Sequence, residues 1–218
     1  MAPEQSLLIS ELFYSIQGES SFSGLACVFF RLAGCNLRCA FCDARYTYEE
    51  PGHDLPLAEF FLFADRYPGA LVEITGGEPL LQENVYPLLS GLLATGRTVL
   101  LETNGSVSLA RGPAEVIKIM DLKCPESGMH DRMLLDNFQY LAASDEIKFV
   151  ISSREDYDWA VRMIKEHDLA RLTKLLFSPN KARLRPALLA DWLLADQMPV
   201  RLQLQLHTLL WPDRSRGA

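Results

Sequence analysis

Short apolar segments rich in β-branched and aromatic residues alternate along this chain with segments of helical periodicity, and this alternation limits its fold. Strands are predicted at residues 7–14, 27–32, 71–75, 98–102, 116–122, 146–151, 174–177 and 200–205. Helices are predicted between them, because apolar residues recur there at i, i+3, i+4 and i+7, with starts near Pro56, Val85, Ser153 and Pro186.

Strand–helix–strand order is typical of parallel βαβ units. The chain has 218 residues, whereas a closed eightfold barrel takes about 250. We therefore expect one α/β domain spanning 1–218, built as an open partial (β/α) barrel of about six parallel strands.

Three cysteines, Cys35, Cys39 and Cys42, follow the second predicted strand within one short loop. A structural zinc site uses four ligands, whereas three thiolates can bind three irons of a four-iron cluster and leave the fourth iron open. The spacing predicts such a cluster, and an open iron indicates a reactive centre. The alternatives are three cysteines that only pack, or a zinc site with a distant fourth ligand.

Polar motifs stand where four further strands are predicted to end. Because the carboxyl ends of parallel strands meet at one edge, we expect these motifs to surround a common ligand site. Taken alone, the motif with paired glycines could equally form a turn, and each of the other three is more typical of loop polarity than of a ligand site. The four are Thr75-Gly76-Gly77-Glu78-Pro79, Glu102-Thr103-Asn104-Gly105, Asp121-Leu122-Lys123 and Ser178-Pro179-Asn180-Lys181. The paired glycines are expected to let a ligand approach the main chain closely.

Arg31 lies within the apolar segment Val28-Phe29-Phe30-Arg31-Leu32, where burying a charge is costly without a partner. If it points inward, a substrate carboxylate is a natural partner for its guanidinium; the alternative is a surface position. Gln17 and Glu19 offer an amide and a carboxylate, which complement a 2-amino-4-oxo heterocycle such as a pterin.

Composition limits the kinds of binding partner and the cellular compartment that we expect for this chain. The net charge of −7 argues against a surface that neutralises nucleic-acid phosphates. Five cysteines, three of them clustered, favour a reducing cytoplasm over a disulfide framework. No apolar run reaches the roughly 18 residues of a membrane span.

The cysteine spacing resembles the cluster motif of the radical S-adenosylmethionine (SAM) enzymes, and Gly76-Gly77-Glu78-Pro79 resembles that family's motif for the SAM amino group. The resemblance implies a [4Fe-4S] cluster held by the three cysteines and SAM bound to the open iron. It also implies that SAM is positioned by Phe41, Cys42, Asp43, Gly77, Glu78, Glu102, Asp121, Leu122, Lys123, Ser178, Pro179, Asn180 and Lys181. Taken alone, Phe41 could be an ordinary core aromatic.

Within that superfamily the chain is most similar to the 7-carboxy-7-deazaguanine synthases. The resemblance rests on Gln17-Gly18-Glu19, Arg31, the cysteine loop, Thr75–Pro79, and Gln205-Leu206-His207-Thr208 with Trp211. It implies conversion of 6-carboxy-5,6,7,8-tetrahydropterin to 7-carboxy-7-deazaguanine with loss of ammonia, by hydrogen abstraction at C6 through a SAM-derived radical. The pterin would be bound by Ile16, Gln17, Gly18, Glu19, Arg31 and Thr75. A homodimer and an electron donor such as flavodoxin or ferredoxin are also implied.

The chain departs from this family directly after Asp43. Relatives commonly carry a Thr or Ser whose hydroxyl touches a Mg²⁺ ion that bridges to the substrate, whereas this chain has Ala44. Because Mg²⁺ keeps several waters and needs few protein oxygens, we expect weakened or indirect magnesium binding.

Two other functions also use an iron–sulfur cluster. An activase that makes a glycyl radical on a partner protein would share the cluster, but Gln17, Glu19 and Arg31 favour a carboxylated small molecule. A non-enzymatic iron–sulfur electron carrier would need a closed coordination sphere and would not need the Gly-Gly-Glu-Pro motif.

Overall fold

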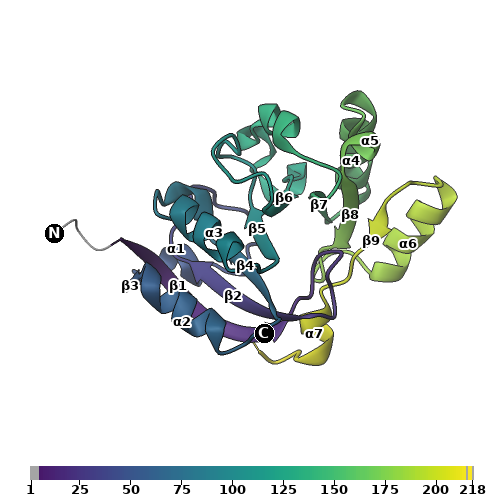
Figure 1. The fold of residues 1–218 in the computed structure, drawn as a ribbon. Helices are drawn as coiled ribbons and strands as arrows, with labels where there is room; N and C mark the ends of the chain where they lie inside the picture. Colours follow the sequence, from purple (N-terminus) through teal and green to yellow (C-terminus); the bar gives the residue numbers. More distant parts are fainter. Residues whose placement is uncertain (1–4, 215, 218) are drawn as a thin grey trace.

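The computed structural model describes residues 5–214, 216 and 217, whose strands form one nine-stranded sheet in the order β3-β1-β2-β4-β5-β6-β7-β8-β9 (Figure 1). The strands are β1 Ser6–Ile16, β2 Ala26–Leu32, β3 His53–Pro56, β4 Leu71–Gly76, β5 Val99–Thr103, β6 Ile117–Asp121, β7 Glu146–Ile151, β8 Lys174–Pro179 and β9 Arg201–Leu202. From β2 to β9 every neighbouring pair is parallel, whereas β1 runs antiparallel to β2 and β3.

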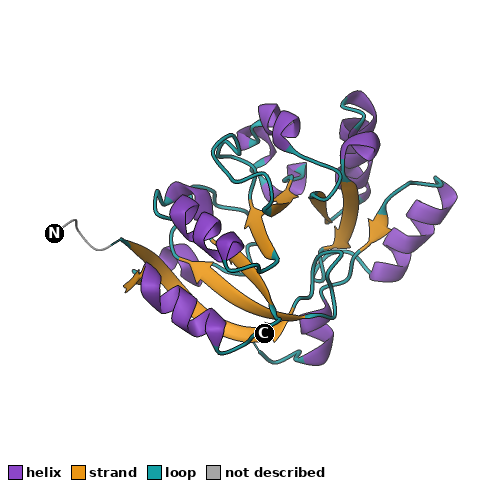
Figure 2. Ribbon diagram, viewed as in Figure 1, coloured by secondary structure: helices purple, strands orange, loops and turns teal. Residues whose placement is uncertain are grey.

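The sheet is strongly curved, and the longer helices lie on its outer side (Figure 2). The helices are α1 Tyr46–Glu49, α2 Leu57–Asp65, α3 Val85–Ala94, α4 Arg154–Glu166, α5 Leu169–Leu172, α6 Pro186–Ala195 and α7 Leu206–Leu210. The described residues also form four short 3₁₀ helices: η1 Pro79–Leu81, η2 Pro125–Ser127, η3 His130–Arg132 and η4 Leu135–Tyr140. The predicted open partial barrel is confirmed, with six full parallel strands and a two-residue seventh, β9.

Two strand predictions need correction. The edge strand β3 was not predicted, because its four residues are half-exposed or exposed and include Pro56 at the end. The last predicted strand, residues 200–205, contracts to Arg201–Leu202. The Gln203 amide still donates to the Phe177 carbonyl of β8, but the Gln203 and Gln205 side chains bind the loop after β1.

The helix boundaries follow from local signals in the sequence. Proline opens α6 and immediately precedes α2, and Gly96 adopts a φ of 77° just after α3, as a C-terminal cap requires. At the start of α4, Ser153 and Asp156 have the spacing of a capping box, but the box is only half formed. Ser153 Oγ accepts from the Asp156 amide at 3.2 Å, but the Asp156 carboxylate accepts from Ser152 and Glu126 amides instead.

The two faces of the sheet differ in chemistry, and this difference positions the site. On β4, Val72 and Ile74 join the hydrophobic core that packs against the outer helices, while the intervening Glu73 and the following Thr75 project to the other face. The same alternation places Lys148 of β7 on the inner face. The interior of the open barrel is therefore lined by charged and polar side chains from several strands.

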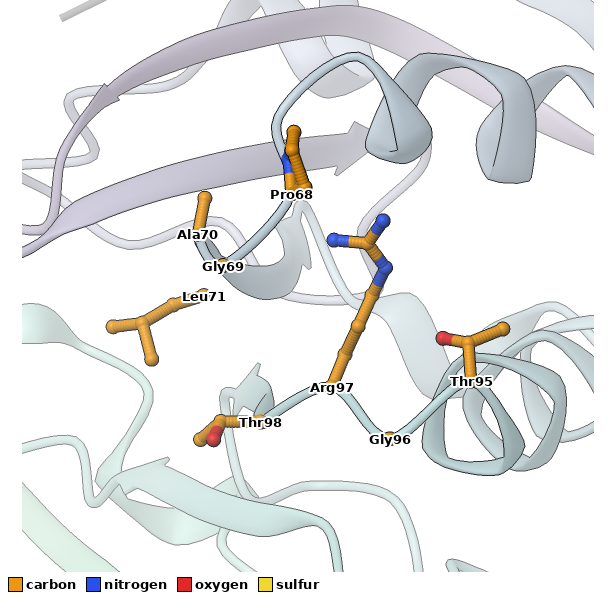
Figure 3. A pocket seen from close by; sticks show the side chains of 8 residues that line it. All are labelled: Pro68, Gly69, Ala70, Leu71, Thr95, Gly96, Arg97 and Thr98. Atoms are coloured by element: carbon orange, nitrogen blue, oxygen red, sulfur yellow. The ribbon is translucent and has the colours of Figure 1, made fainter.

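No helix among the described residues is long and apolar enough to cross a membrane. A surface pocket lies at the amino ends of β4 and β5, the edge opposite to the strand-end motifs (Figure 3). It is lined by Pro68, Gly69, Ala70, Leu71, Thr95, Gly96, Arg97 and Thr98. The Arg97 guanidinium there is bound to Asp65 at 2.9 Å, so the pocket offers no free cation.

Candidate active site at the carboxyl ends of the parallel strands

The three clustered cysteines lie together in the loop that leaves β2, half-buried and free of disulfide bonds. Burial raises the pKa of the Cys39 thiol, and the Cys42 and Cys35 thiols raise it further, while the Lys123 ammonium opposes them. Cys39 therefore lies near enough to Cys35 and Cys42 for their charges to act on its thiol. In the part of the chain that the structure describes, no three His, Cys, Asp or Glu side chains converge closely enough for a single metal ion. The spacing of the three cysteines in the sequence still predicts a cluster, in which each thiolate binds a different iron.

Gly76 and Gly77 are required by the packing of two loops. Gly76 has a φ of 140°, and a Cβ there would lie 2.2 Å from the Leu32 carbonyl oxygen. A Cβ on Gly77 would lie 2.0 Å from the Gly34 carbonyl oxygen, and the amides of Gly77 and Glu78 donate to Leu32 and Gly34. The expectation that these glycines leave bare main chain for a ligand is therefore wrong for the Gly77 amide. They lock the Gly-Gly-Glu-Pro loop onto the cysteine loop.

Glu78 is completely buried and anchors the same loop to the end of β5. Its carboxylate accepts from the amides of Leu80 at 3.0 Å and Asn104 at 2.7 Å, and from the Thr103 hydroxyl at 2.9 Å. Burial raises its pKa to about 7, and these hydrogen bonds oppose the rise. Because its carboxylate accepts these three hydrogen bonds and is fully buried, Glu78 holds the loop in place in this structure.

Asp121 and Lys123 stand beside the cysteine loop at the end of β6. Lys123 Nζ lies 2.8 Å from Asp121 Oδ2, and the Lys123 ammonium lies near enough to Cys39 to lower the pKa of that thiol. The second carboxylate oxygen, Asp121 Oδ1, is buried without a hydrogen-bond partner among the described residues. A buried acceptor left unpaired is costly, so a ligand hydroxyl or amine at this point would be stabilised. The residues present therefore fit a polar cofactor beside the cluster.

Lys148 lies at the centre of the inner face and pairs with carboxylates from three elements. Its Nζ lies 3.0 Å from Glu19, 3.8 Å from Asp121, and within hydrogen-bonding contact of Glu102. Although burial raises the pKa of Glu102, the Lys148 ammonium and the Thr75 hydroxyl hold it at about 2. Glu102 is therefore ionised and linked to both neighbours.

Arg31 lies on the inner face and is partly buried, with its side chain 19% exposed. Its Nε donates to Glu11 of β1 at 2.8 Å, and the Tyr46 hydroxyl donates to the same oxygen at 2.7 Å. Neither Nη atom hydrogen-bonds to a described residue. The purely surface alternative is wrong, because the guanidinium is paired and packs 5.6 Å from the Phe13 ring.

Gln17 is buried, and both ends of its amide are committed to the protein. Its Oε1 accepts from the Glu19 and Ser20 amides at 3.0 Å, and its Nε2 donates to Glu73 at 3.0 Å. In the structure Gln17 therefore stabilises its own loop. The sequence had predicted that its amide hydrogen-bonds to the edge of a heterocycle. Glu19 is the member of this motif whose carboxylate extends into the barrel, toward Lys148.

The C-terminal segment folds back onto the same loop. Gln205 Nε2 donates to Glu19 at 3.1 Å, and Gln203 Nε2 donates to the Gly18 carbonyl at 3.2 Å. A Cβ on Gly18 would lie 2.8 Å from His207 Nδ1, so a larger residue there would have to displace the histidine. His207 therefore lies against Gly18, in the loop that carries Glu19.

The other predicted residues divide between the site and its surroundings. The Leu122 side chain belongs to the hydrophobic core, so only its main chain can face a cofactor. The Asn180 side chain is bound by the protein, because it donates to Ser152 after β7 at 3.0 Å and accepts from the Ala182 amide in its own turn. Lys181 and Asp43 are exposed, Ser178 and Pro179 are buried at the end of β8, and Phe41, Ile16 and Ala44 are half-buried.

Several residues of the site were not predicted from the sequence, namely Lys148, Glu73, Glu11 and Tyr46. A usable signal existed for Lys148 and Glu73, because each is a charged residue inside an apolar strand, the same signal that identified Arg31. No signal in the sequence pairs Glu11 with Arg31, since their contact depends on the antiparallel register of β1 and β2.

Comparison with known proteins identifies the family. The model of the Radical SAM superfamily matches residues 31–126. A 7-carboxy-7-deazaguanine synthase of Koribacter versatilis is 43% identical over 224 residues, covering 96% of this chain and 99% of that protein. One of Chlorobaculum tepidum is also 43% identical, over the full length of both chains. The chain belongs to the 7-carboxy-7-deazaguanine synthase family.

A crystal structure of QueE from Escherichia coli has the same fold, with a TM-score of 0.75 at 22% identity over 92% of this chain and 94% of that one. As a radical SAM enzyme of the 7-carboxy-7-deazaguanine synthase family, the chain uses a [4Fe-4S] cluster and SAM, requires a reductant, and acts on a small molecule. Electron-carrier function without catalysis is thereby excluded.

Proposed function

We propose that this protein converts 6-carboxy-5,6,7,8-tetrahydropterin to 7-carboxy-7-deazaguanine with release of ammonia, a step toward queuosine and other 7-deazapurines. The observation that carries the proposal is similarity to named 7-carboxy-7-deazaguanine synthases along the whole chain. In support, Glu19, Arg31 and Thr75 project into the same interior as the strand ends beside the cysteine loop.

Cys35, Cys39 and Cys42 would hold the cluster, and Asp121, Lys123, Glu102 and Ser178 would bind SAM around it. Together these cofactors supply a carbon radical that removes a hydrogen atom from the substrate. The unpaired Asp121 Oδ1 is suited to a hydroxyl of the SAM ribose. Glu78 and Gly77 would act by fixing the loop beside the cysteines.

On the substrate side, Arg31 has the geometry to bind a carboxylate. Its Nε is held by Glu11, which orients the guanidinium, and its two Nη atoms remain for a bidentate contact. Glu19 would accept from the amino and ring N–H groups of the pterin, and Thr75, bound to Glu102 at 2.9 Å, would contact the same ring. Ile16 and Gly18 would line this end of the pocket, and Gln17 would set the loop.

We propose a homodimer in the cytoplasm, reduced by a flavodoxin or ferredoxin. Magnesium would bind weakly or through water and substrate oxygens, because Ala44 supplies no side-chain ligand and its carbonyl already accepts from Thr47 at 2.8 Å. Neither nucleic acid nor a membrane is proposed as a partner.

The proposal can be tested against the remaining alternative by product analysis. Anaerobically reconstituted protein is incubated with SAM and dithionite, with and without 6-carboxy-5,6,7,8-tetrahydropterin. We expect ammonia and a deazapurine only when the pterin is present. Cleavage of SAM without turnover of the pterin, together with a radical on a glycyl-radical partner, would favour the activase function.

A further inference from the structure

The loop between β1 and β2, residues 17–25, lies across the inner face of the sheet and is fastened at separate points. Gln17 contacts Glu73 of β4, Glu19 contacts Lys148 of β7, and Ser21 donates its amide to Glu146 of β7 at 3.1 Å. These partners are between 56 and 129 positions away in the chain. The position of Glu19 in the barrel therefore depends on how this loop is held.

Glu73 anchors the loop through a hydrogen bond and not through an ion pair. It is 3% exposed, and no ion pair joins it to any described residue, since Lys148 is engaged by Glu19, Glu102 and Asp121. Its Oε2 accepts from Gln17 Nε2 at 3.0 Å. Gln17 in turn accepts from the Glu19 and Ser20 amides. One continuous chain of hydrogen bonds thus runs from a buried carboxyl to the backbone of the substrate loop.

The groups that face Glu73 come from four elements. They are Glu102 on β5, Lys148 on β7, Glu19 and Gln17 in the loop, and the buried Cys27 thiol on β2. Burial raises the pKa of Glu73 to about 8, and Glu102 and Glu19 raise it while Gln17 and Lys148 oppose the rise. At neutral pH the carboxyl therefore carries its proton and adds no negative charge beside two carboxylates.

We propose that Glu73 is a positioning residue that holds the substrate loop as a neutral hydrogen-bonding group, so that its ionisation loosens the loop and weakens substrate binding. The inference rests on the proposed function for the identity of the substrate, and Glu73 itself need not touch it. Above the pKa of Glu73, a third carboxylate enters the space shared with Glu102 and Glu19, and repulsion displaces Glu19.

Three forms of the reconstituted holoenzyme test this inference: wild type, Glu73→Gln and Glu73→Leu. Gln keeps a carbonyl acceptor for Gln17 and cannot ionise, whereas Leu removes the acceptor. The affinity for 6-carboxy-5,6,7,8-tetrahydropterin is measured with SAM present from about pH 6.5 to about pH 9. We expect wild-type affinity to fall about tenfold across this range and Glu73→Gln to stay nearly level. Glu73→Leu should bind about tenfold more weakly throughout, because Gln17 loses its partner.

Hydrogen exchange of the peptide covering residues 17–25, corrected for intrinsic rates, supplies a readout that needs no substrate. Loss of protection in wild type as the pH rises through about 8, absent in Glu73→Gln, would support the inference even if Glu73→Leu fails to fold. Equal pH dependence in wild type and Glu73→Gln would overturn it. Failure of wild type to bind the pterin at any pH would instead refute the proposed function, and the exchange measurement would still decide the role of Glu73.

Discussion

Lys148 Nζ lies 3.0 Å from the carboxylate of Glu19, a residue 129 positions earlier in the chain. The same ammonium pairs with Glu102 and lies 3.8 Å from Asp121, so one cation joins the substrate loop to the ends of β5 and β6. The proposed substrate side and the proposed SAM side therefore share one charge network. A substitution on the substrate side is therefore expected to alter SAM binding, and a substitution on the SAM side to alter substrate binding.

This network predicts how folding stability responds to acid. The pKa of Glu102 is about 2 in the folded protein against an ordinary value of 4.5, so its ionised form stabilises the fold above pH 4.5. That contribution is lost as the pH falls from about 4.5 to about 2, roughly 1–3 kcal/mol in size. Glu102→Gln should flatten this part of the curve of unfolding free energy against pH. The exposed Glu59→Gln should leave it unchanged, and equal curves for wild type and Glu102→Gln would contradict the assignment.

Cluster retention should depend on three cysteines and not on the other two. Cys35→Ala, Cys39→Ala and Cys42→Ala are each expected to lose the oxygen-labile iron and the formation of 5′-deoxyadenosine. Cys27→Ala and Cys124→Ala are the controls, because both thiols are buried and burial raises the pKa of each, which keeps them protonated. Iron content, the visible absorbance of the cluster and SAM cleavage are the measurements. Full activity in Cys39→Ala would end this account of the cysteine loop.

The sequence predicted the fold well because alternating apolar segments and helical periodicity determine a parallel sheet without knowledge of distant contacts. It predicted the location of the site for the same reason, since motifs at strand ends must meet at one edge. It did not predict how individual side chains would be used. Gln17 and Glu78 are polar residues in conspicuous motifs, but their hydrogen-bonding capacity is taken up by main-chain and side-chain partners that only the folded chain brings near.

Lys148, by contrast, is a residue of the site that the sequence analysis did not predict. A charged residue inside an apolar strand was a usable signal, but its role depends on three carboxylates that approach it from other elements. The edge strand β3 was missed for a simpler reason, since four largely exposed residues provide no periodic pattern.

Arg31 is expected to act on the substrate and not on SAM. Loss of a charge-assisted contact costs about 1.5–3 kcal/mol, so Arg31→Ala should weaken pterin binding by about tenfold or more. SAM cleavage uncoupled from pterin turnover should survive in this variant. Glu11→Gln is the matched control, because it keeps an acceptor for Arg31 Nε and retains the guanidinium. If Arg31→Ala removes SAM binding and leaves pterin affinity intact, the assignment is wrong.

Magnesium dependence should be weak in this protein. Ala44 stands where relatives commonly place a hydroxyl, so water and substrate oxygens must complete the coordination of any bound ion. Titration with a chelator at saturating substrate is expected to lower turnover only partly, and Ala44→Thr should make turnover depend more strongly on Mg²⁺. Complete loss of turnover when Mg²⁺ is removed from wild type would show that another residue supplies the ligand.

The most direct test of the proposed reaction is mass spectrometry of the products formed anaerobically from reduced enzyme, SAM and 6-carboxy-5,6,7,8-tetrahydropterin. The account predicts 7-carboxy-7-deazaguanine and one ammonia for each pterin consumed, with SAM regenerated over repeated turnovers. Recovery of unchanged pterin alongside 5′-deoxyadenosine and methionine, from enzyme with a full cluster, would contradict it.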